Sequence, residues 1–556
     1  MSAQKFDFKK CKYGLFVHFV HGLSFFSDGK RPQDPNETVA TFDAEGFAKD
    51  IAETGAQFLI FTAWHMNTIP LYPSEVNAKW RGIEPIKRDL LGEIIDAVNA
   101  RGVGVILYTH PRDGHDFGEA SRASTGWGKG HREGGGNDTA NPDTFDYARW
   151  NEYVKELYTE LADRYADKIF GFYTDGMGPW DGRSSAAENN FQVVDYLMLR
   201  NIIKSKNPNA VIIQNHFGYI FSNDFEMPEG YFGYEKEALW GFVSRLPAAE
   251  KSLAMSTFKD SWMPKHPLGE NDIGSYAAPI ENAVKFVLFN ASCTVGGGTV
   301  YAAGPYCEGN IWADGAIEYL KRLGKKLGEY KESSLDAKVS KSFPTISGDT
   351  LESLGNRFFT TSNDEKYEYL HLMGAQKEVT LPRPIDGATL HSPLSLTSGL
   401  AVSHFDGKKL TLTGDFDPID SVIRFERTNS VVSGFEWIND SNKRFKYSEG
   451  WKYHNLDQYE TRQKMTLGCF ESDLHQSLVA GASVFIAFEG SAVEIYGRGQ
   501  VSVFVDGVKL ADAECELKSN GRRNLLYTTM NLHGGWHTLY LVTDKEFHFD
   551  AIKVIK

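Results

Sequence analysis

The chain has 556 residues, too many for a single hydrophobic core, so two to four domains are expected. Hydrophobic residues make up 41% and charged residues 24%, as in soluble globular proteins, and the formal net charge of -14 argues against nucleic acid and membrane surfaces as partners. Aromatic residues, 13% of the chain, suit flat ligands such as sugar rings and equally suit large apolar cores.

The cysteines and the N-terminal segment bear on the cellular compartment. Five widely spaced cysteines fit neither a disulfide framework nor a Cys-x-x-Cys metal site. The N-terminal segment lacks the apolar core of a signal peptide, and no apolar run is long enough to span a membrane. We therefore expect a cytoplasmic protein. A periplasmic or secreted protein whose signal peptide had been removed would have the same sequence.

Strand and helix patterns alternate over the first three fifths of the chain. Apolar runs bounded by turn residues predict strands at 13–19, 57–65, 103–111, 169–173, 210–217 and 298–304, with a further segment at 252–258. Helical periodicity predicts helices at 44–55, 86–102, 144–168, 193–206, around 281–291 and at 314–330. Residues 114–137 predict a long loop, and residues 224–240 an irregular acidic and aromatic region.

This alternation requires parallel strands joined by crossover helices. An α/β (β/α)8-like TIM barrel over residues 1–335 matches the size, and a doubly wound open sheet is the alternative, although no GxGxxG follows a strand. Short alternating runs then predict a small antiparallel β-sandwich domain at 336–430. Regular alternation with an Asp-Gly hairpin turn predicts a second β-sandwich module at 431–556.

The segment from Ile169 to Trp180 contains the main candidate for a catalytic residue. Its apolar run leads directly into Thr174-Asp175-Gly176, so Asp175 lies where a buried strand ends, the edge at which barrels collect catalytic groups. A lone Asp-Gly is more often an ordinary turn. Here the other predicted strands also end in polar or aromatic residues, namely His18, Trp64, His65, Tyr108, His110, Asp113, Tyr173, Asn215 and His216.

Paired carboxylates among histidines and aromatic rings suit glycoside cleavage, with one as nucleophile or stabiliser and the other as proton donor. A histidine ring of His18, His65, His110 and His216 is the basis for a metal-dependent hydrolase as the weaker alternative, but no HxH or HExxH pair is present. No metal and no other cofactor is predicted. The chain also lacks a Gly-x-Ser-x-Gly elbow and a phosphate loop.

Six segments, in order from residue 12 to about 330, resemble glycoside hydrolase family 29, the α-L-fucosidases. They are KYGLFVHF, FLIFTAWHMNTIPLYPSEVNAKW with the following PIKRDLLGEIIDA, GVILYTH, GFYTDG, NDFEMPEG and TVGGGTVYAAGPYCEGNI. The resemblance implies a retaining mechanism in a (β/α)8-like barrel that precedes a C-terminal β-sandwich. It also implies an oligosaccharide or polysaccharide as the partner.

The resemblance assigns roles to individual residues. Asp175 takes the position of the nucleophile and Glu229 that of the acid/base, which implies carboxyl groups about 5–5.5 Å apart. The acid/base assignment has four alternatives nearby, Glu226, Glu235, Glu237 and Glu250. The residues expected to bind the substrate are His18, Trp64, His65, Tyr108, His110, Tyr173 and His216.

The sequence departs from the family pattern at four places. Trp64-His65 replaces a histidine pair, Met66-Asn67 replaces an Asp-Gly, Tyr173 replaces a tryptophan, and His216 replaces an arginine, so different sugar hydroxyls can be paired. The expected substrate is therefore a terminal α-L-fucosyl or related sugar. The alternative is a catalytically altered carbohydrate-binding protein on the same scaffold.

The last module resembles the galactose-binding-type sandwiches appended to many glycosidases. Two roles are open for it: binding polysaccharide through loop aromatics such as Trp451, Tyr453 or Trp536, or only packing on the barrel. The oligomeric state cannot be read from the sequence.

Overall fold

The computed structural model describes most of the chain. The described residues are 7–65, 67–114, 116–129, 141, 143–175, 194–214, 224–227, 229–230, 253–256, 279–294, 296–313, 315–345, 349–382, 384, 386–428, 435–455, 473–515, 525–529, 532 and 535–555. They divide into two compact units, the first ending at Ala337 and the second beginning at Lys338.

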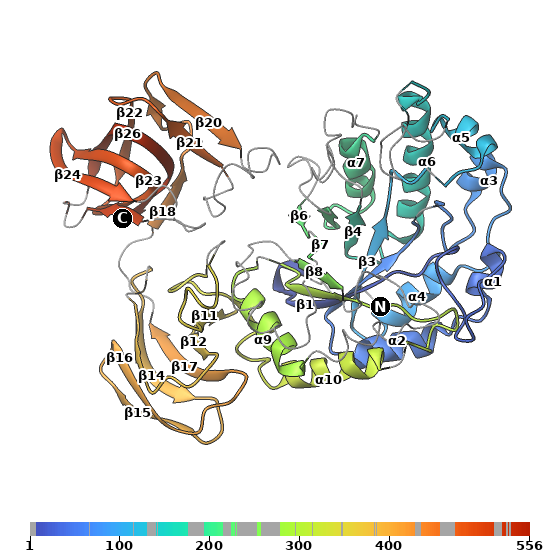
Figure 1. The fold of residues 1–556 in the computed structure, drawn as a ribbon, viewed down its shortest axis with the longest axis horizontal. Coiled ribbons are helices and arrows are strands. Elements are labelled where there is room, and N and C mark those ends of the chain that lie inside the picture. Colours follow the sequence, from blue (N-terminus) through green and yellow to red (C-terminus); the bar gives the residue numbers. More distant parts are fainter. Residues whose placement is uncertain are drawn as a thin grey trace. The chain divides into compact units, whose positions relative to one another are not determined.

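One parallel sheet forms the centre of the first unit (Figure 1). Its strands are β1 (Tyr13–Val17), β2 (Phe58–Thr62), β3 (Gly104–Thr109), β4 (Gly171–Thr174), β5 (Val211–Gln214), β6 (Phe225–Glu226), β7 (Glu229–Gly230), β8 (Leu253–Ser256) and β9 (Thr299–Ala302). They pair in the order β6-β5-β4-β3-β2-β1-β9-β8-β7, and every pairing is parallel.

The two edge strands of this sheet are consecutive pieces of one segment, residues 225–230. β6 pairs with β5, while β7, which begins only three residues after Glu226, pairs with β8. The segment therefore joins both edges and serves as the sixth of eight barrel strands. This confirms the predicted barrel and excludes the doubly wound alternative, because an open sheet ends in two unrelated strands.

Helices follow most barrel strands in the sequence (Figure 1). The structure has α1 (Pro35–Ala40), α2 (Ala44–Glu53), α3 (Glu75–Arg81), α4 (Leu90–Asn99), α5 (Glu119–Thr125), α6 (Tyr147–Tyr165), α7 (Tyr196–Lys206), α9 (Ile280–Ala291) and α10 (Ala316–Gly328), with a short 3-10 turn η1 (Phe8–Lys10). The predicted helices are confirmed. α4 begins later than predicted because the Asp89 carboxylate accepts from the Gly92 amide and caps the helix there.

Two predicted irregular regions contain regular structure. The predicted loop at 114–137 includes α5, and the predicted irregular region at 224–240 includes the sixth barrel strand. Asp224, which precedes that strand, accepts hydrogen bonds from Arg200, Lys204 and the Ile212 amide. Burial opposes ionisation of Asp224, but these donors hold its pKa below the ordinary value, so its carboxylate ties the sixth strand to α7 and β5.

Aromatic and aliphatic side chains fill the barrel. Phe16, Tyr108 and Tyr173 belong to this core together with Ile60, Ile106, Ile213, Met227 and Val300. β1 to β4 are buried along their whole length, as expected for parallel strands covered on both faces. β4 can lie this close to β5 because residue 171 is glycine: a Cβ there would lie 2.0 Å from the carbonyl oxygen of Val211.

The second unit contains antiparallel sheets. A five-stranded sheet (β10-β11-β12-β17-β14) and a three-stranded sheet (β13-β16-β15) share one apolar core, which makes a sandwich. Their strands are β10 (Ala337–Val339), β11 (Arg357–Ser362), β12 (Tyr367–Leu372), β13 (Glu378–Thr380), β14 (Thr389–Ser395), β15 (Leu400–Phe405), β16 (Lys409–Gly414) and β17 (Ser421–Thr428).

The C-terminal module has its own strands and its own core. Its strands are β18 (Phe435–Asn439), β19 (Lys446–Tyr447), β20 (Trp451–Asn455), β21 (Asp473–Ser477), β22 (Ser483–Glu489), β23 (Ala492–Val505), β24 (Val508–Cys515), β25 (Leu525–Thr528) and β26 (Trp536–Ile555). Asp506-Gly507 turns β23 into β24, as the sequence predicts, with both residues at positive φ. The predicted β-sandwich character of this region is confirmed.

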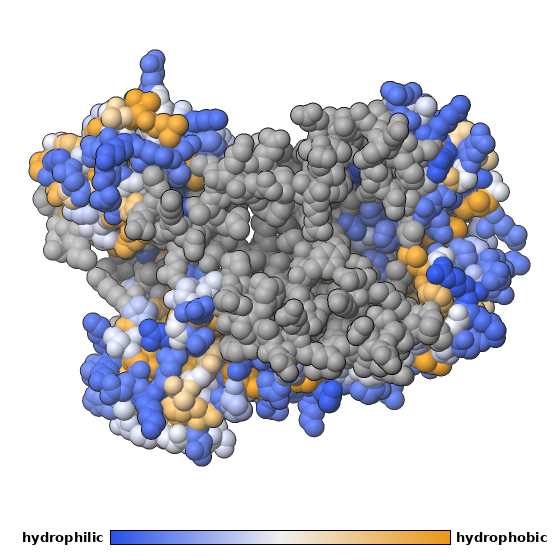
Figure 2. Space-filling view, viewed as in Figure 1, coloured by the Kyte–Doolittle hydropathy of each residue, from blue (hydrophilic) through white to orange (hydrophobic). Residues whose placement is uncertain are grey.

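The described surface is mainly hydrophilic on the face shown in Figure 2, with separate hydrophobic patches. Among the described residues, no helix is long and apolar enough to cross a membrane.

A buried carboxyl group in the middle sandwich is expected to make its stability depend on pH. Glu368 on β12 is fully buried and accepts hydrogen bonds from Ser340 and, at 2.7 Å, from Thr361. Burial raises the pKa of Glu368 from 4.5 to about 7, although these hydroxyls and the guanidinium of Arg427, 3.9 Å away, oppose the shift.

We expect this sandwich to lose stability as the pH rises from about 4.5 to about 7, since the folded state retains a proton that the unfolded chain releases. The loss amounts to about 3 kcal/mol at most. Hydrogen exchange of β11, β12 and β17 amides, corrected for intrinsic rates, measures it. Glu368→Gln should flatten the dependence, whereas Glu378→Gln, at an exposed position of β13, should preserve it. An unchanged slope in Glu368→Gln would contradict the assignment.

Candidate active site

Three strands of the barrel, β1, β3 and β4, show the same residue pattern at their C-terminal ends. An interior aromatic residue is followed two positions later by a polar residue: Phe16 and His18 at β1, Tyr108 and His110 at β3, and Tyr173 and Asp175 at β4. Residues two apart on a strand share a face. The pattern therefore brings the polar residues to the mouth of the barrel, above its aromatic core.

Asp175 is held in position by its backbone and by its side chain. Its amide donates to the carbonyl oxygen of Thr109 at 2.9 Å, which continues the β3–β4 pairing one residue beyond β4. The hydroxyl of Tyr108 donates to Asp175 Oδ2 at 2.5 Å. The carboxylate is half-buried, so it is accessible to a ligand while its orientation is fixed by a charge-assisted hydrogen bond.

His18 is an uncharged imidazole next to this carboxylate. It is only 4% exposed, and its ring lies 5.0 Å from that of Tyr108 and 5.8 Å from that of His65. Burial, with a smaller contribution from His65, lowers the pKa of His18 to about 3 despite the opposing effect of Asp175. Near neutral pH His18 can therefore exchange hydrogen bonds with a hydroxyl group without neutralising Asp175.

His65 is oriented by an aspartate. Its Nδ1 lies 2.6 Å from Oδ2 of Asp113, which is 1% exposed, and its ring stacks on that of His110 with centroids 5.1 Å apart and planes 8° apart. The hydroxyl of Thr68 donates to the backbone carbonyl of Asp113. An ionised Asp113 favours the tautomer with the proton on Nδ1, which leaves His65 Nε2 as an acceptor.

Tyr173 contacts both Tyr108, which binds Asp175, and the sixth strand. Its ring stacks on that of Tyr108, with centroids 5.7 Å apart and an interplanar angle of 20°. Its hydroxyl donates to the carbonyl oxygen of Met227 at 2.9 Å. Both Tyr173 and Met227 are fully buried. The Tyr173 hydroxyl thus makes its hydrogen bond within the barrel.

The structure brings together six of the nine sequence-predicted site residues: His18, His65, Tyr108, His110, Tyr173 and Asp175. Trp64 is fully buried, and its ring packs against that of Tyr158 of α6, with centroids 5.3 Å apart. His216 lies outside the described residues, as do Glu235, Glu237 and Glu250. Glu226 and Glu229 are described only as backbone positions of β6 and β7.

Asp113 is the residue whose role the sequence does not predict. The pattern places it at the end of the third strand, but its partner His65 lies 48 residues earlier, and no local spacing links the two. The sequence does not predict a role for Met227 either, because the sixth strand is split into two pieces of two residues each.

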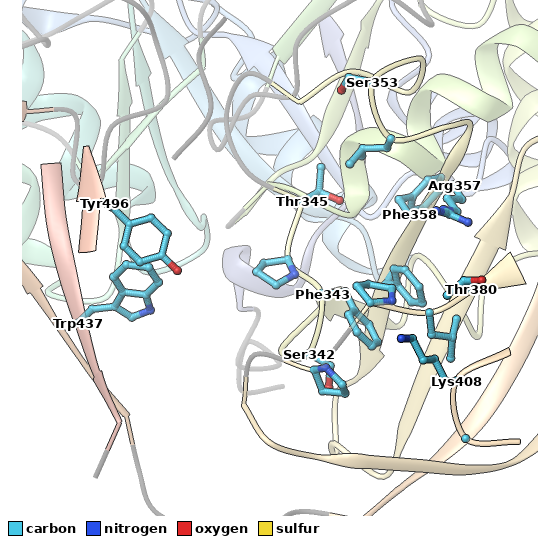
Figure 3. Close-up of a pocket in the computed structure, with 17 residues that line it drawn as sticks. Ser342, Phe343, Thr345, Ser353, Arg357, Phe358, Thr380, Lys408, Trp437 and Tyr496 are labelled. Atoms are coloured by element: carbon cyan, nitrogen blue, oxygen red, sulfur yellow. The ribbon is translucent and has the colours of Figure 1, made fainter. Parts of the chain in front are cut away.

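Elsewhere, the described residues form a pocket but no metal centre. Within the described part of the chain, no group of three His, Cys, Asp or Glu side chains is arranged to hold a metal ion. A pocket of the second unit, around Phe343, Phe358, Thr380 and Lys408 (Figure 3), has no Asp, Glu or His among its described lining residues, so it offers no carboxyl or imidazole group for acid/base chemistry. The barrel mouth is therefore the candidate active site.

A closed parallel barrel that fixes the Asp175 carboxylate beside the uncharged His18 at its C-terminal mouth has these polar groups where barrel enzymes hold their active sites. The family model described as "Alpha-L-fucosidase" matches residues 4–332. The chain belongs to this family of glycoside hydrolases.

Solved structures of bacterial enzymes share the fold. An α-L-fucosidase from Bacteroides thetaiotaomicron is 15% identical, with a TM-score of 0.50 over 77% of this chain and 97% of that chain. Isoenzyme 1 from Paenibacillus thiaminolyticus is 14% identical, with a TM-score of 0.50 over 76% and 98%. A Caenorhabditis elegans relative named as an α-L-fucosidase is 32% identical over 72 residues, and this match spans only 15% of that relative and 13% of this chain.

Proposed function

We propose that the chain is a retaining, exo-acting glycoside hydrolase that removes a terminal α-L-fucosyl or closely related sugar. The observation that carries this proposal is the half-buried Asp175 carboxylate, fixed by Tyr108 at the barrel mouth beside the neutral His18. Family membership supports a carbohydrate substrate.

In the first step, Asp175 attacks the anomeric carbon as the glycosidic bond breaks, and a glutamate protonates the departing oxygen. In the second step, the same glutamate takes a proton from water, whose oxygen displaces Asp175 and releases the free sugar. A related B. thetaiotaomicron enzyme, 15% identical with a TM-score of 0.51, has been solved as a trapped covalent intermediate with 2-fluoro-fucosyl fluoride, which supports the double displacement.

We assign the acid/base role to Glu229. Its backbone lies on β7, two residues beyond Met227, whose side chain belongs to the barrel core. Residues two apart on a strand share a face, so the register of Glu229 matches that of the core-facing Met227, while Glu226 occupies the alternate register. In this proposal the sugar hydroxyls bind to His18, which is uncharged, to His65, which Asp113 orients, and to His110, whose ring stacks on that of His65.

A panel of aryl glycosides tests the assignment, with 4-nitrophenyl α-L-fucoside beside α-L-rhamnoside, β-D-galactoside and β-D-fucoside. We expect hydrolysis of the α-L-fucoside or a close α-L-configured relative, with the released sugar first appearing in its α configuration. First release of the β anomer would contradict the double displacement.

A second candidate is a catalytically altered carbohydrate-binding protein. It is favoured by Trp64, which stands where the family has a histidine and packs against Tyr158. If this candidate is correct, calorimetry should detect binding of a glycoside from the panel, and none of the glycosides should be hydrolysed.

A further inference from the structure

The two reacting carboxyl groups of a retaining glycosidase must keep a set separation. In this barrel they come from strands that are not neighbours, since Asp175 follows β4 and the sixth strand pairs with β5. β5 pairs with both and relates them only indirectly. Tyr173 of β4 contacts the sixth strand directly.

The hydroxyl of Tyr173 reaches past β5 to the sixth strand. Tyr173 lies on β4, two residues before Asp175, and its hydroxyl donates to the carbonyl oxygen of Met227 at 2.9 Å. The amide of Met227 donates in turn to the carbonyl oxygen of Gln214 on β5 at 3.0 Å. Both backbone polar groups of Met227 are thus hydrogen-bonded, the amide to β5 and the carbonyl oxygen to Tyr173 of β4. Glu226 immediately precedes Met227, and Glu229 follows it by two residues.

The ring of Tyr173 connects Met227 to Asp175 through Tyr108. It stacks on Tyr108, and the hydroxyl of Tyr108 donates to Asp175 Oδ2 at 2.5 Å. Phe16 packs against both tyrosine rings from β1, with centroids 5.3 Å away in each case. The two stacked tyrosines therefore form one rigid unit, with one hydroxyl on the Asp175 carboxylate and the other on the backbone of the sixth strand.

We propose that Tyr173 is a positioning residue whose hydroxyl sets the sixth strand, and with it the acid/base glutamate, at the distance from Asp175 that double displacement requires. This rests on the proposed function. A displacement of about 1 Å at an acid catalyst costs up to about 100-fold in rate, which makes a single strand-to-strand hydrogen bond sufficient.

The test is the dependence of kcat/KM on the leaving group. Tyr173→Phe removes only the hydroxyl, and kcat/KM is measured for phenyl, 4-nitrophenyl and 2,4-dinitrophenyl α-L-fucosides, or for the sugar that the panel identifies. Phenol needs protonation to depart, and dinitrophenol does not. We expect kcat/KM to fall about tenfold or more for the phenyl substrate and less than about threefold for the dinitrophenyl substrate.

An equal loss on all three substrates, or no loss, would overturn the proposal, because a general structural defect or a defect at Asp175 does not discriminate between leaving groups. Should Tyr173→Phe not fold, Tyr173→Trp, which fills the site without a hydroxyl, is subject to the same expectation. Tyr158→Phe is the matched control: Tyr158 is equally buried, and its hydroxyl lies 2.6 Å from Thr109 Oγ1. It should leave the ratio of the three values unchanged.

Glu229→Gln and Glu226→Gln, assayed in parallel, separate this inference from the proposed function. If one of them discriminates between leaving groups and Tyr173→Phe does not, the acid/base assignment stands and the positioning role of Tyr173 is wrong. If neither glutamate variant discriminates, the assignment of the acid/base to this strand fails, and the role of Tyr173 fails with it.

Discussion

Asp175→Asn is expected to lower kcat/KM for the preferred glycoside by about 10⁴-fold or more, which corresponds to about 5 kcal/mol of lost transition-state stabilisation. An amide has no charge with which to attack the anomeric carbon. Because the amide oxygen can still accept from Tyr108 and the backbone hydrogen bond to Thr109 is unaffected, the substitution should leave the fold intact. Steady-state kinetics together with thermal unfolding separates the two effects.

Asp89→Asn provides the matched control. Asp89 accepts from the Gly92 amide at the start of α4 and from the hydroxyl of Tyr165, so its replacement should lower thermal stability while the folded fraction retains most of its activity. The proposed role of Asp175 would be contradicted by undiminished hydrolysis in Asp175→Asn, or by a loss of activity that only follows a loss of folded protein.

Glu229→Gln is expected to have the second largest effect, and one that depends on the substrate. Without the proton donor, kcat/KM for the phenyl glycoside should fall by about 10²- to 10⁴-fold, with a much smaller loss for the dinitrophenyl glycoside. Azide should restore turnover of the dinitrophenyl glycoside, since it attacks the glycosyl-enzyme without base catalysis, and the glycosyl azide should keep the configuration of the substrate.

Glu226→Gln is the control for this prediction, because Glu226 and Glu229 lie on the two pieces of the same strand. It should lack both the leaving-group dependence and the azide effect. If Glu226→Gln shows both and Glu229→Gln shows neither, the acid/base is Glu226. The period-two argument from Met227 would then not extend through this segment.

The sequence predicts those parts of the site that depend on local periodicity. The apolar run before Asp175 identifies a buried strand and its end, and the same reasoning places His18 and His110 at the mouth of the barrel. Alternation fails after β2, because this strand ends at Thr62 and the chain leaves the sheet before Trp64. Trp64 then packs outward on α6, and its neighbour His65 joins the cluster.

The sequence does not predict the contacts between segments that are far apart in the chain. Nothing near His65 indicates that Asp113 orients it, and nothing in the run containing Tyr173 indicates that its hydroxyl reaches Met227, 54 residues later. The sixth strand was missed because two-residue pieces carry no periodicity, and their pairing arises only when the barrel closes. The contacts of Trp64 with Tyr158 and of Tyr173 with Met227 likewise follow from packing and not from any local pattern.

The central claim is that Asp175 forms a covalent bond with the sugar, and trapping that species tests it most directly. The chain is incubated with 2-fluoro-fucosyl fluoride, whose fluorine slows hydrolysis of the glycosyl-enzyme, and is then digested and sequenced by mass spectrometry. We predict a mass increase of one fluorofucosyl group per chain, located on Asp175 and absent from Asp175→Asn. A label on another carboxylate, or an unlabelled chain that hydrolyses the fluoride, would contradict the claim.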